Sequence, residues 1–356
     1  MRFLPLKEVR PGQFLARTLY DEQCRILLKA GVELRADYIE RLKKIGLSGI
    51  FVRDEFTDLL DFADVVSEKT QMEAYRAIRE AMNEASNSTC IHSREVMDTV
   101  KDLIDEIVSN RKHLLTLNDL RMAGTYAMGH GVSVCITAVR MGLALGYDEL
   151  KLKQLGIGAL LHDVGKGKID RALLDKSRLT LEEQNIVKQH TLEGFELIRA
   201  NGEFSVLSAH VAFQHHEKWD GTGYPRGLKG EEITEFSRIV AVSEEYDNLT
   251  HERPGQKRLQ PHEAIHVMVN GMPGHFDPDM LTLLSKTIAI YPVGCQVKLN
   301  TGEIAIVART YRDFPTKPAV RLIKNADGSD TTVEVEYELA QHKDKFVIEV
   351  LKVLVK

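Results

Sequence analysis

Hydrophobic and polar positions divide the chain into zones that predict different kinds of structure. Near the start, residues 14–20 alternate as a strand does, residues 25–31 can return as the second strand of a hairpin, and residues 49–53 predict a short closing strand. Residues 36–44 between them have helical periodicity. We therefore expect a small mixed α/β module over residues 1–60.

The next zone is polar and favours helices. Residues 64–118 contain no glycine, and their apolar positions recur at spacings of three and four. This pattern predicts long connecting helices over residues 61–118. The pattern fits two roles equally well, a seam between two copies of the chain or a plain amphipathic cover on the next domain.

Residues 119–290 have a mainly helical pattern, and residues 291–356 have a strand pattern. Segments 134–147 and 154–167 are apolar enough for buried helices, with Gly146 and Gly165 at helix ends or sharp turns. Thr180 is a candidate N-cap, and Glu183 completes a capping box. The tail has short apolar runs separated by turn residues, at 291–299, 303–310, 319–323, 331–337 and 345–351. We expect a mainly α protein whose helical domain is flanked by the N-terminal module and a small β-barrel-like C-terminal module.

Composition narrows the classes of function. The 356 residues carry a net charge of -5, which argues against wrapping bulk nucleic acid. Four scattered cysteines without a CxxC pair favour a reducing compartment. The N-terminal segment MRFLPLKEVRPG has no apolar core of a signal peptide, and no run approaches the ~18 apolar residues of a membrane helix. We expect a cytoplasmic protein that does not contact a membrane.

Histidines and acidic residues recur on successive predicted helices, an arrangement in which a helical bundle directs ligands inward. An isolated His-Asp pair such as His162-Asp163 has little diagnostic value. Here further histidines come before and after it, and Lys166 follows three residues later. Imidazoles with a bridging carboxylate and a nearby cation are what two-metal phosphodiester hydrolysis requires. The candidates are His130, His162, Asp163, His190, His215 and His216.

Several long motifs in this order resemble the HD-GYP family, a branch of the HD-domain metal-dependent phosphohydrolases. The motifs cover about residues 119–290 and read GHGVSV, LLHDVGKGKI, LTLEEQNIVKQHTLEGFELI, HHEKWDGTGYPRGLKGEEI and SRIVAVSEEYDNLTHERP. The resemblance implies hydrolysis of cyclic-di-GMP to pGpG, GMP or both by a hydroxide that bridges two metals. A purely general HD nucleotidase is disfavoured by DGTGYP.

The resemblance also assigns roles by position. His130, His162, Asp163 and Glu244 would hold one metal, and Asp163 would bridge to a second metal held with His190, His215 and His216. Asp163 and Lys166 would be catalytic, and the substrate would contact Lys166, Tyr224, Arg253 and Lys257. Two divalent ions, iron or manganese, suit this donor set. The family's GYP loop further implies a GGDEF-type cyclase as partner, and a homodimer remains open.

The chain departs from the family pattern at three positions. Glu244 stands where the family has aspartate, Gln256 replaces a basic residue beside Lys257, and Tyr126 replaces a glutamate that accompanies a third metal in some members. Tyr126 at this position favours two metals. Glu244 and the altered basic segment support one alternative, a cyclic-di-GMP sensor or scaffold with weak turnover. A second alternative also stays open, a phosphodiesterase for a related cyclic dinucleotide such as mixed cyclic GMP-AMP.

Overall fold

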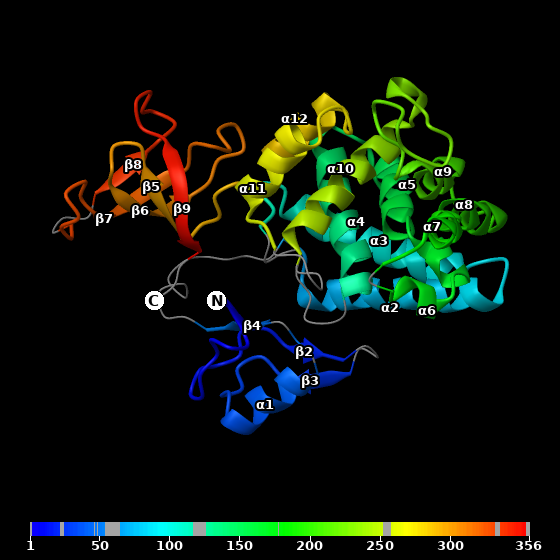
Figure 1. Cartoon of the computed structure of the whole chain (residues 1–356), viewed down its shortest axis with the longest axis horizontal. Helices are drawn as coiled ribbons and strands as arrows, with labels where there is room; N and C mark the ends of the chain where they lie inside the picture. The colour runs from blue at the N-terminus through cyan, green and yellow to red at the C-terminus, as the bar shows by residue number, and fades with distance from the viewer. Residues whose placement is uncertain are drawn as a thin grey trace. The chain divides into compact units, whose positions relative to one another are not determined.

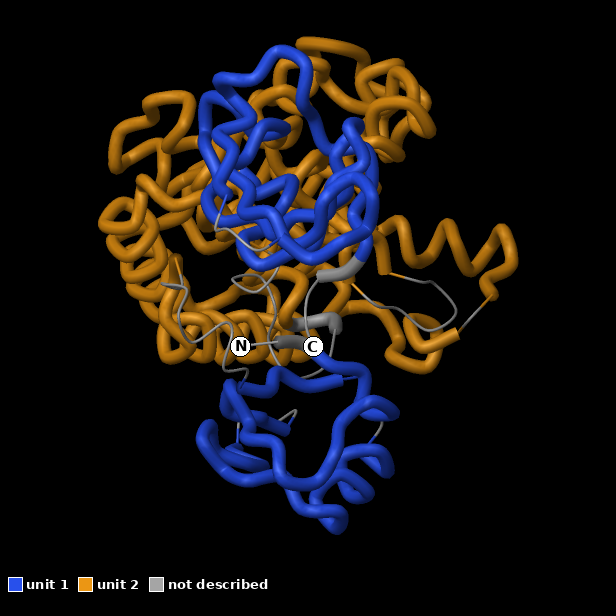
Figure 2. Tube along the Cα trace, turned by 90° about the vertical axis from the view of Figure 1, so that its left-hand side faces the viewer, with its two compact units in different colours: residues 1–63, 122–125, 288–356 blue, residues 64–121, 126–287 orange. Residues whose placement is uncertain are grey.

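A computed structural model describes residues 2–21, 25–45, 47, 49–53, 65–116, 126–176, 178–251, 258–331 and 335–353. The backbone divides into two compact units (Figure 2). One contains residues 1–63, 122–125 and 288–356, and the other contains residues 64–121 and 126–287. In the described residues, no helix is both long enough and apolar enough to cross a membrane.

The N-terminal module is built from two small antiparallel pairs and one helix (Figure 1). Strand β1 (Arg2–Pro5) pairs with β4 (Gly49–Val52), β2 (Leu19–Tyr20) pairs with β3 (Ile26–Leu28), and α1 covers Ala36–Lys44. Leucine, isoleucine and valine side chains from these elements form one buried cluster. The predicted hairpin, helix and closing strand are confirmed. The sequence did not predict β1, because it is short and ends in proline, and its partner lies at the far end of the module.

The C-terminal module is a five-stranded antiparallel sheet in the order β8-β7-β6-β5-β9. Burial alternates along β5, as a sheet with one covered face requires. The predicted strand segments are confirmed, although part of segment 331–337 lies outside the described residues. The strands are β5 (Cys295–Leu299), β6 (Ile304–Arg309), β7 (Ala319–Lys324), β8 (Glu336–Glu338) and β9 (Val347–Val353).

The second unit is helical and carries every described candidate for metal binding. The capping box of Thr180 and Glu183 forms as predicted at the start of α7. The early helices are α2 (Glu68–Asn87), α3 (Ser93–Ser109), α4 (Tyr126–Ala144), α5 (Glu149–Leu160) and the 3₁₀ turn η1 (Val164–Lys168). The later ones are α6 (Arg171–Leu174), α7 (Leu181–Lys188), α8 (His190–Ala200), α9 (Val206–Gln214), η2 (Gly230–Glu232), α10 (Glu235–Thr250), α11 (Pro261–His266), the π-helical turn η3 (Val267–Gly271) and α12 (Pro278–Thr287).

Helices α2 and α3 cover the other helices of this unit. They pack against each other, α2 also contacts α4 and η1, and α3 also contacts α4 and α5. The buried positions of α2 recur with helical spacing on one face, among them Ala74, Ile78, Ala81 and Ala85. The apolar stripes of both helices are therefore covered within the chain, which supports the amphipathic-cover interpretation.

Candidate metal centre

The His162–Asp163 pair lies where α5 ends and η1 begins. His162 is fully buried, and its Nδ1 lies 2.7 Å from the carbonyl oxygen of Ala159 one turn earlier. A carbonyl can only accept, so Nδ1 carries a proton and Nε2 is the ring nitrogen that serves as a metal ligand once it is deprotonated. Burial lowers the pKa of this ring, but the charge of Asp163 beside it outweighs burial and raises the pKa. Within the described residues neither His162 Nε2 nor Asp163 Oδ1 has a hydrogen-bond partner, although both atoms are buried. The pair therefore places two potential metal-ligating atoms, both without a hydrogen-bond partner, in the interior of the helical unit.

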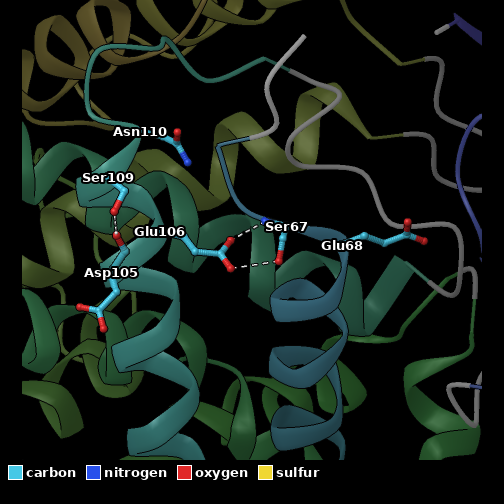
Figure 3. Close-up of a pocket in the computed structure, with 6 residues that line it drawn as sticks. All are labelled: Ser67, Glu68, Asp105, Glu106, Ser109 and Asn110. Carbon is cyan, nitrogen blue, oxygen red and sulfur yellow. Dashed lines mark hydrogen bonds between the residues drawn. The ribbon is translucent and has the colours of Figure 1, made fainter.

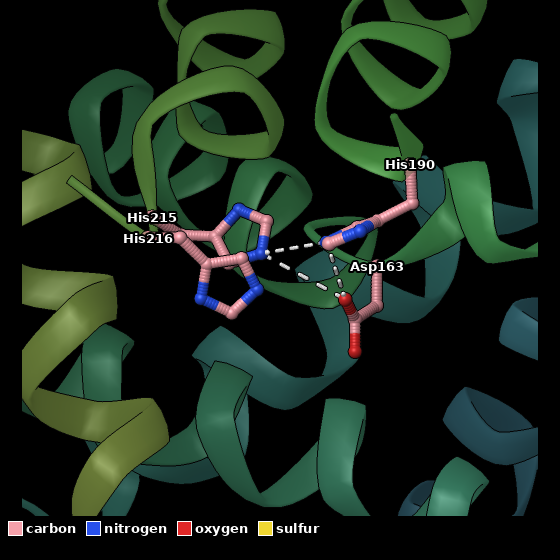
Figure 4. A group of neighbouring side chains, drawn as sticks. All are labelled: Asp163, His190, His215 and His216. Carbon is pink, nitrogen blue, oxygen red and sulfur yellow. Dashed lines mark hydrogen bonds and ion pairs between the residues drawn. The ribbon is translucent and has the colours of Figure 1, made fainter. Parts of the chain in front are cut away.

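His190 and His215 are held by the same device. His190 Nδ1 donates to the carbonyl of Val187 at 2.7 Å, and His215 Nδ1 lies 3.1 Å from the carbonyl of Val211. Their Nε2 atoms then face each other at 3.3 Å (Figure 4). Two lone pairs at this distance repel, unless a proton or another cation lies beside them.

Burial decides which cation fits. Desolvation lowers the pKa of His215 to about 3, and it lowers the pKa of His190 and of His216 as well. The three rings are therefore neutral at physiological pH, and protonation does not resolve the repulsion. A divalent ion is the ligand that suits neutral imidazole nitrogens and a carboxylate in one buried cluster.

The candidate ligands fall into two groups. Within each group, donor atoms lie within 4.8 Å of one another. Asp163 Oδ1 lies 3.4 Å from His190 Nε2 and 3.7 Å from His215 Nε2. His162 Nε2 lies 3.5 Å from the other oxygen, Asp163 Oδ2, which links the groups. The groups are Asp163, His190, His215 and His216, and His130, His162 and Glu244.

Asp247 orients the first histidine of the cluster, a role that the sequence did not indicate. Its Oδ2 lies 2.6 Å from His130 Nδ1, and its Oδ1 lies 2.9 Å from His251 Nδ1. Burial alone would raise the pKa of Asp247, but the charge of His251 and the hydrogen bond from His130 outweigh it and lower the pKa. An ionised Asp247 keeps the proton of His130 on Nδ1, so that Nε2 is available as a ligand. Its spacing of three residues after Glu244, on one face of α10, is the pattern that could have revealed it.

Two carboxyls of the cluster respond differently to their surroundings. Desolvation raises the pKa of Glu244 to about 7. Desolvation acts on Asp163 in the same direction, but the charges of Lys166 and His162 outweigh it and hold the pKa well below the ordinary value. Asp163 is therefore the anionic member on which both groups converge.

Lys166 and Tyr224 lie beside the cluster, as the sequence led us to expect. Lys166 Nζ is 2.5 Å from Asp163 Oδ2. The ring of Tyr224 lies 4.7 Å from that of His216, centroid to centroid, at an interplanar angle of 30°. Arg253 and Lys257 lie outside the described residues.

A buried carboxylate shapes the loop that carries Tyr224. Glu217 accepts the backbone N–H of Arg226 at 2.8 Å and that of Leu228 at 3.0 Å, so it clamps the loop rather than a histidine. Gly223 fits against the same stretch: a Cβ there would lie 2.3 Å from the nitrogen of Lys218 and 2.5 Å from Glu217 Cα. The loop thus has room for glycine alone at this position.

Three other residues near the cluster make contacts within the protein. Asp220 caps its own loop by accepting from the N–H and hydroxyl of Thr222. The Arg238 guanidinium lies 5.5 Å from the centroid of the Trp219 ring, and the backbone N–H of Trp219 donates to the carbonyl of His275. His210 packs on Phe195 and joins neither ligand group.

A close approach of η1 to α8 brings Asp163 and Lys166 to His190. A Cβ at Gly165 would lie 2.0 Å from the carbonyl oxygen of His190 and 2.5 Å from the nitrogen of Gly194. The absence of a side chain in the HDVGKG segment is what permits this contact.

A separate cavity lies between the start of α2 and the end of α3 (Figure 3). Glu106 there accepts hydrogen bonds from the N–H and hydroxyl of Ser67 and from the hydroxyl of Thr70, so it caps α2. None of its lining residues belongs to the ligand groups; they are Ser67, Glu68, Asp105, Glu106, Ser109 and Asn110.

Comparison with family models places the sequence of this chain in a known family. A model of the HD domain matches residues 102–280, about half of the chain, and a model of a KOW domain associated with the HD domain matches residues 296–353. The solved structure of Bd1817, a HDG"Y"P protein from Bdellovibrio bacteriovorus, is similar at a TM-score of 0.49 and 19% identity, over 80% of this chain and 97% of that chain.

Curated relatives are similar over part of their length. Cyclic di-GMP phosphodiesterase PA4108 of Pseudomonas aeruginosa is 31% identical over 71% of this chain and 61% of its own. A cyclic di-GMP phosphodiesterase of Thermotoga maritima is 39% identical over 41% of this chain and 40% of its own. 3'3'-cGAMP-specific phosphodiesterase 3 of Vibrio cholerae is 32% identical over 47% of this chain and 36% of its own length. The chain thus spans less than two thirds of each relative. With its HD-domain match and its HHE and DGTGYP motifs, it belongs to the HD-GYP branch of the HD-domain family.

Proposed function

We propose that the chain is a metal-dependent phosphodiesterase that hydrolyses cyclic-di-GMP. The observation that carries the proposal is the meeting of two ligand groups at Asp163, with Lys166 beside them. The names of the relatives support the class of substrate. In this proposal one ion is held by His130, His162, Asp163 and Glu244, and the other by Asp163, His190, His215 and His216.

Each part of the chain has a defined task in this reaction. When bound, two divalent ions supply Lewis acidity and lower the pKa of a water molecule. Asp163 would contribute negative charge to both ions, and the imidazoles anchored to backbone carbonyls would present their Nε2 atoms as ligands. The ammonium of Lys166 is positioned to receive charge from the phosphoryl oxygens. We propose iron or manganese as the ions, and pGpG, GMP or both as products.

The test combines metal content with product analysis. His162→Ala and Asp163→Ala proteins should lose hydrolysis of cyclic-di-GMP and bind less metal than the wild type after anaerobic reconstitution with iron or manganese. His210→Ala is the matched control, because this histidine lies on α9 outside both ligand groups. Full activity and unchanged metal content in the Asp163→Ala protein would overturn the proposal.

Two competing functions are outcomes of the same assay. Binding of cyclic-di-GMP without product would identify a sensor, the alternative that the Glu244 position raises. Faster turnover of mixed cyclic GMP-AMP would identify a related substrate, which the name of the Vibrio cholerae relative supports. Chromatography of products from both dinucleotides separates these outcomes.

Partners form a further part of the proposal. The exposed side chains of the clamped loop, Thr222, Arg226 and Lys229, provide a surface for a GGDEF-type cyclase. Co-purification of a cyclase with the wild type, and its loss in a variant with all three side chains replaced by alanine, tests this contact. Sedimentation analysis tests a homodimer.

A further inference from the structure

A second lysine approaches the candidate metal centre from α7. Lys188 is the last residue of α7, and His190 of the ligand cluster follows two positions later. The Lys188 ammonium lies 5.0 Å from the centroid of the Tyr224 ring, a distance at which cation and aromatic face attract each other. The same ring lies against His216. A positive charge therefore stands one aromatic ring away from the ligands.

The backbone of Lys188 is fixed by the turn that also fixes His190. Its carbonyl accepts a hydrogen bond of 3.0 Å from the hydroxyl of Thr191, which is fully buried. The preceding carbonyl, of Val187, accepts from His190 Nδ1. The base of this lysine side chain is thus set in the same turn as a ligand, while its four-carbon stem remains adjustable.

The charge of Lys188 is available to a ligand. Its side chain is exposed, and across the described parts of the chain no carboxylate forms an ion pair with it. Lys166 differs in this respect, because it is paired with Asp163. Lys176, on the approach to α7, is likewise paired with Glu183.

A cyclic dinucleotide brings two phosphodiesters to the site, and only one of them is cut at a time. The second phosphate lies away from the scissile bond but keeps its negative charge, and lysine is a common point-charge partner of phosphate. We propose that Lys188 binds this uncut phosphate, so that it favours cyclic dinucleotides over substrates with a single phosphodiester. The inference rests on the proposed function and deepens it.

The experiment compares a substrate that has the second phosphate with one that lacks it. Lys188→Ala should weaken equilibrium binding of a slowly hydrolysed phosphorothioate analogue of cyclic-di-GMP by about tenfold, at the low end for a charged contact because the group is exposed. The KM for cyclic-di-GMP should rise by a similar factor with little change in kcat. Hydrolysis of bis(p-nitrophenyl) phosphate, which has one phosphodiester, should be unchanged.

Two controls separate charge from structure. Lys188→Arg should restore binding, and 0.5 M salt should narrow the difference between wild type and Lys188→Ala, because salt screens an exposed charge. Lys151→Ala is the matched variant: the Lys151 ammonium lies 4.8 Å from the Tyr147 ring, and neither residue belongs to the ligand groups. It should bind the analogue as the wild type does.

The outcomes distinguish this inference from the function on which it rests. Wild-type protein that neither binds nor hydrolyses any cyclic dinucleotide would refute the proposed function and the role of Lys188 together. Wild-type activity combined with normal binding by Lys188→Ala would overturn the role of Lys188 alone. An equal loss toward both substrates would also overturn it, since the effect would then not depend on the second phosphate.

Discussion

Replacing Asp247 with asparagine tests how the chain orients a ligand. The side chain keeps its shape but loses its charge, and its amide can present an N–H group to His130 Nδ1, where the carboxylate accepts at 2.6 Å. An amide N–H at Nδ1 favours the tautomer whose proton is on Nε2, and a protonated Nε2 cannot ligate a metal ion. The substitution therefore weakens the binding of one metal ion without replacing any of its ligands.

The expected size follows from the burial of the pair. His130 and Asp247 are 5% and 1% exposed, so water cannot replace the lost contact. Loss of such a partner to a metal-binding histidine typically lowers metal affinity about 10- to 100-fold. This corresponds to about 1.4 to 2.7 kcal/mol of binding free energy. We expect the affinity of the His130 group for its ion to fall by this factor. The affinity of the His190 group for its ion should change little.

Titration of metal-depleted protein with manganese, followed by calorimetry and metal analysis, measures both affinities. Asp277→Asn is the matched control, because Asp277 is also buried and its Oδ2 lies 2.7 Å from a guanidinium nitrogen of Arg238. Asp277 belongs to neither ligand group. It should melt at a lower temperature yet bind both ions normally. An Asp247→Asn protein that holds two ions with wild-type affinity would refute the reasoning.

Three further predictions concern the loop and the histidines. Gly223→Ala should lower kcat/KM at least about tenfold with metal content unchanged, because the new Cβ collides with backbone and displaces Tyr224; unaltered kinetics would contradict this. Glu217→Gln should lower the free energy of unfolding in urea by about 2 kcal/mol, since two N–H groups lose a charged acceptor. In metal-stripped protein His215 has its pKa lowered to about 3, so only the unfolded state takes up its proton between pH 6.5 and 3. Stability should fall by about 2 kcal/mol for this histidine from pH 6.5 to 5, and His215→Asn should flatten that slope in thermal melts.

Local features of the fold could be predicted from the sequence. Helix α1 has the predicted bounds, and the capping box at Thr180 forms as expected, because both depend on residues a few positions apart. Strand β1 could not be predicted, because its partner among the described strands is β4, at the far end of the module. The four residues of β1 are too few for their hydrophobic pattern to indicate pairing with a segment more than forty residues away.

The candidate site divides in the same way. Motif order named the histidines and acidic residues that the fold gathers into two groups. Contacts across long separations were beyond it: Asp247 reaches His130 only because α10 packs on α4, and Lys188 reaches Tyr224 only because the clamped loop folds toward α7. Both side chains take their significance from a neighbour that the sequence does not identify.

The Glu217 clamp makes the two sides of its loop independent of each other. The carboxylate holds backbone rather than side chains, so its two hydrogen bonds do not depend on what Arg226 carries outward. Mutations at this exposed position can accumulate without disturbing Tyr224 on the inner side. Related chains can therefore change what their outer loop surface recognises while the reaction underneath stays the same.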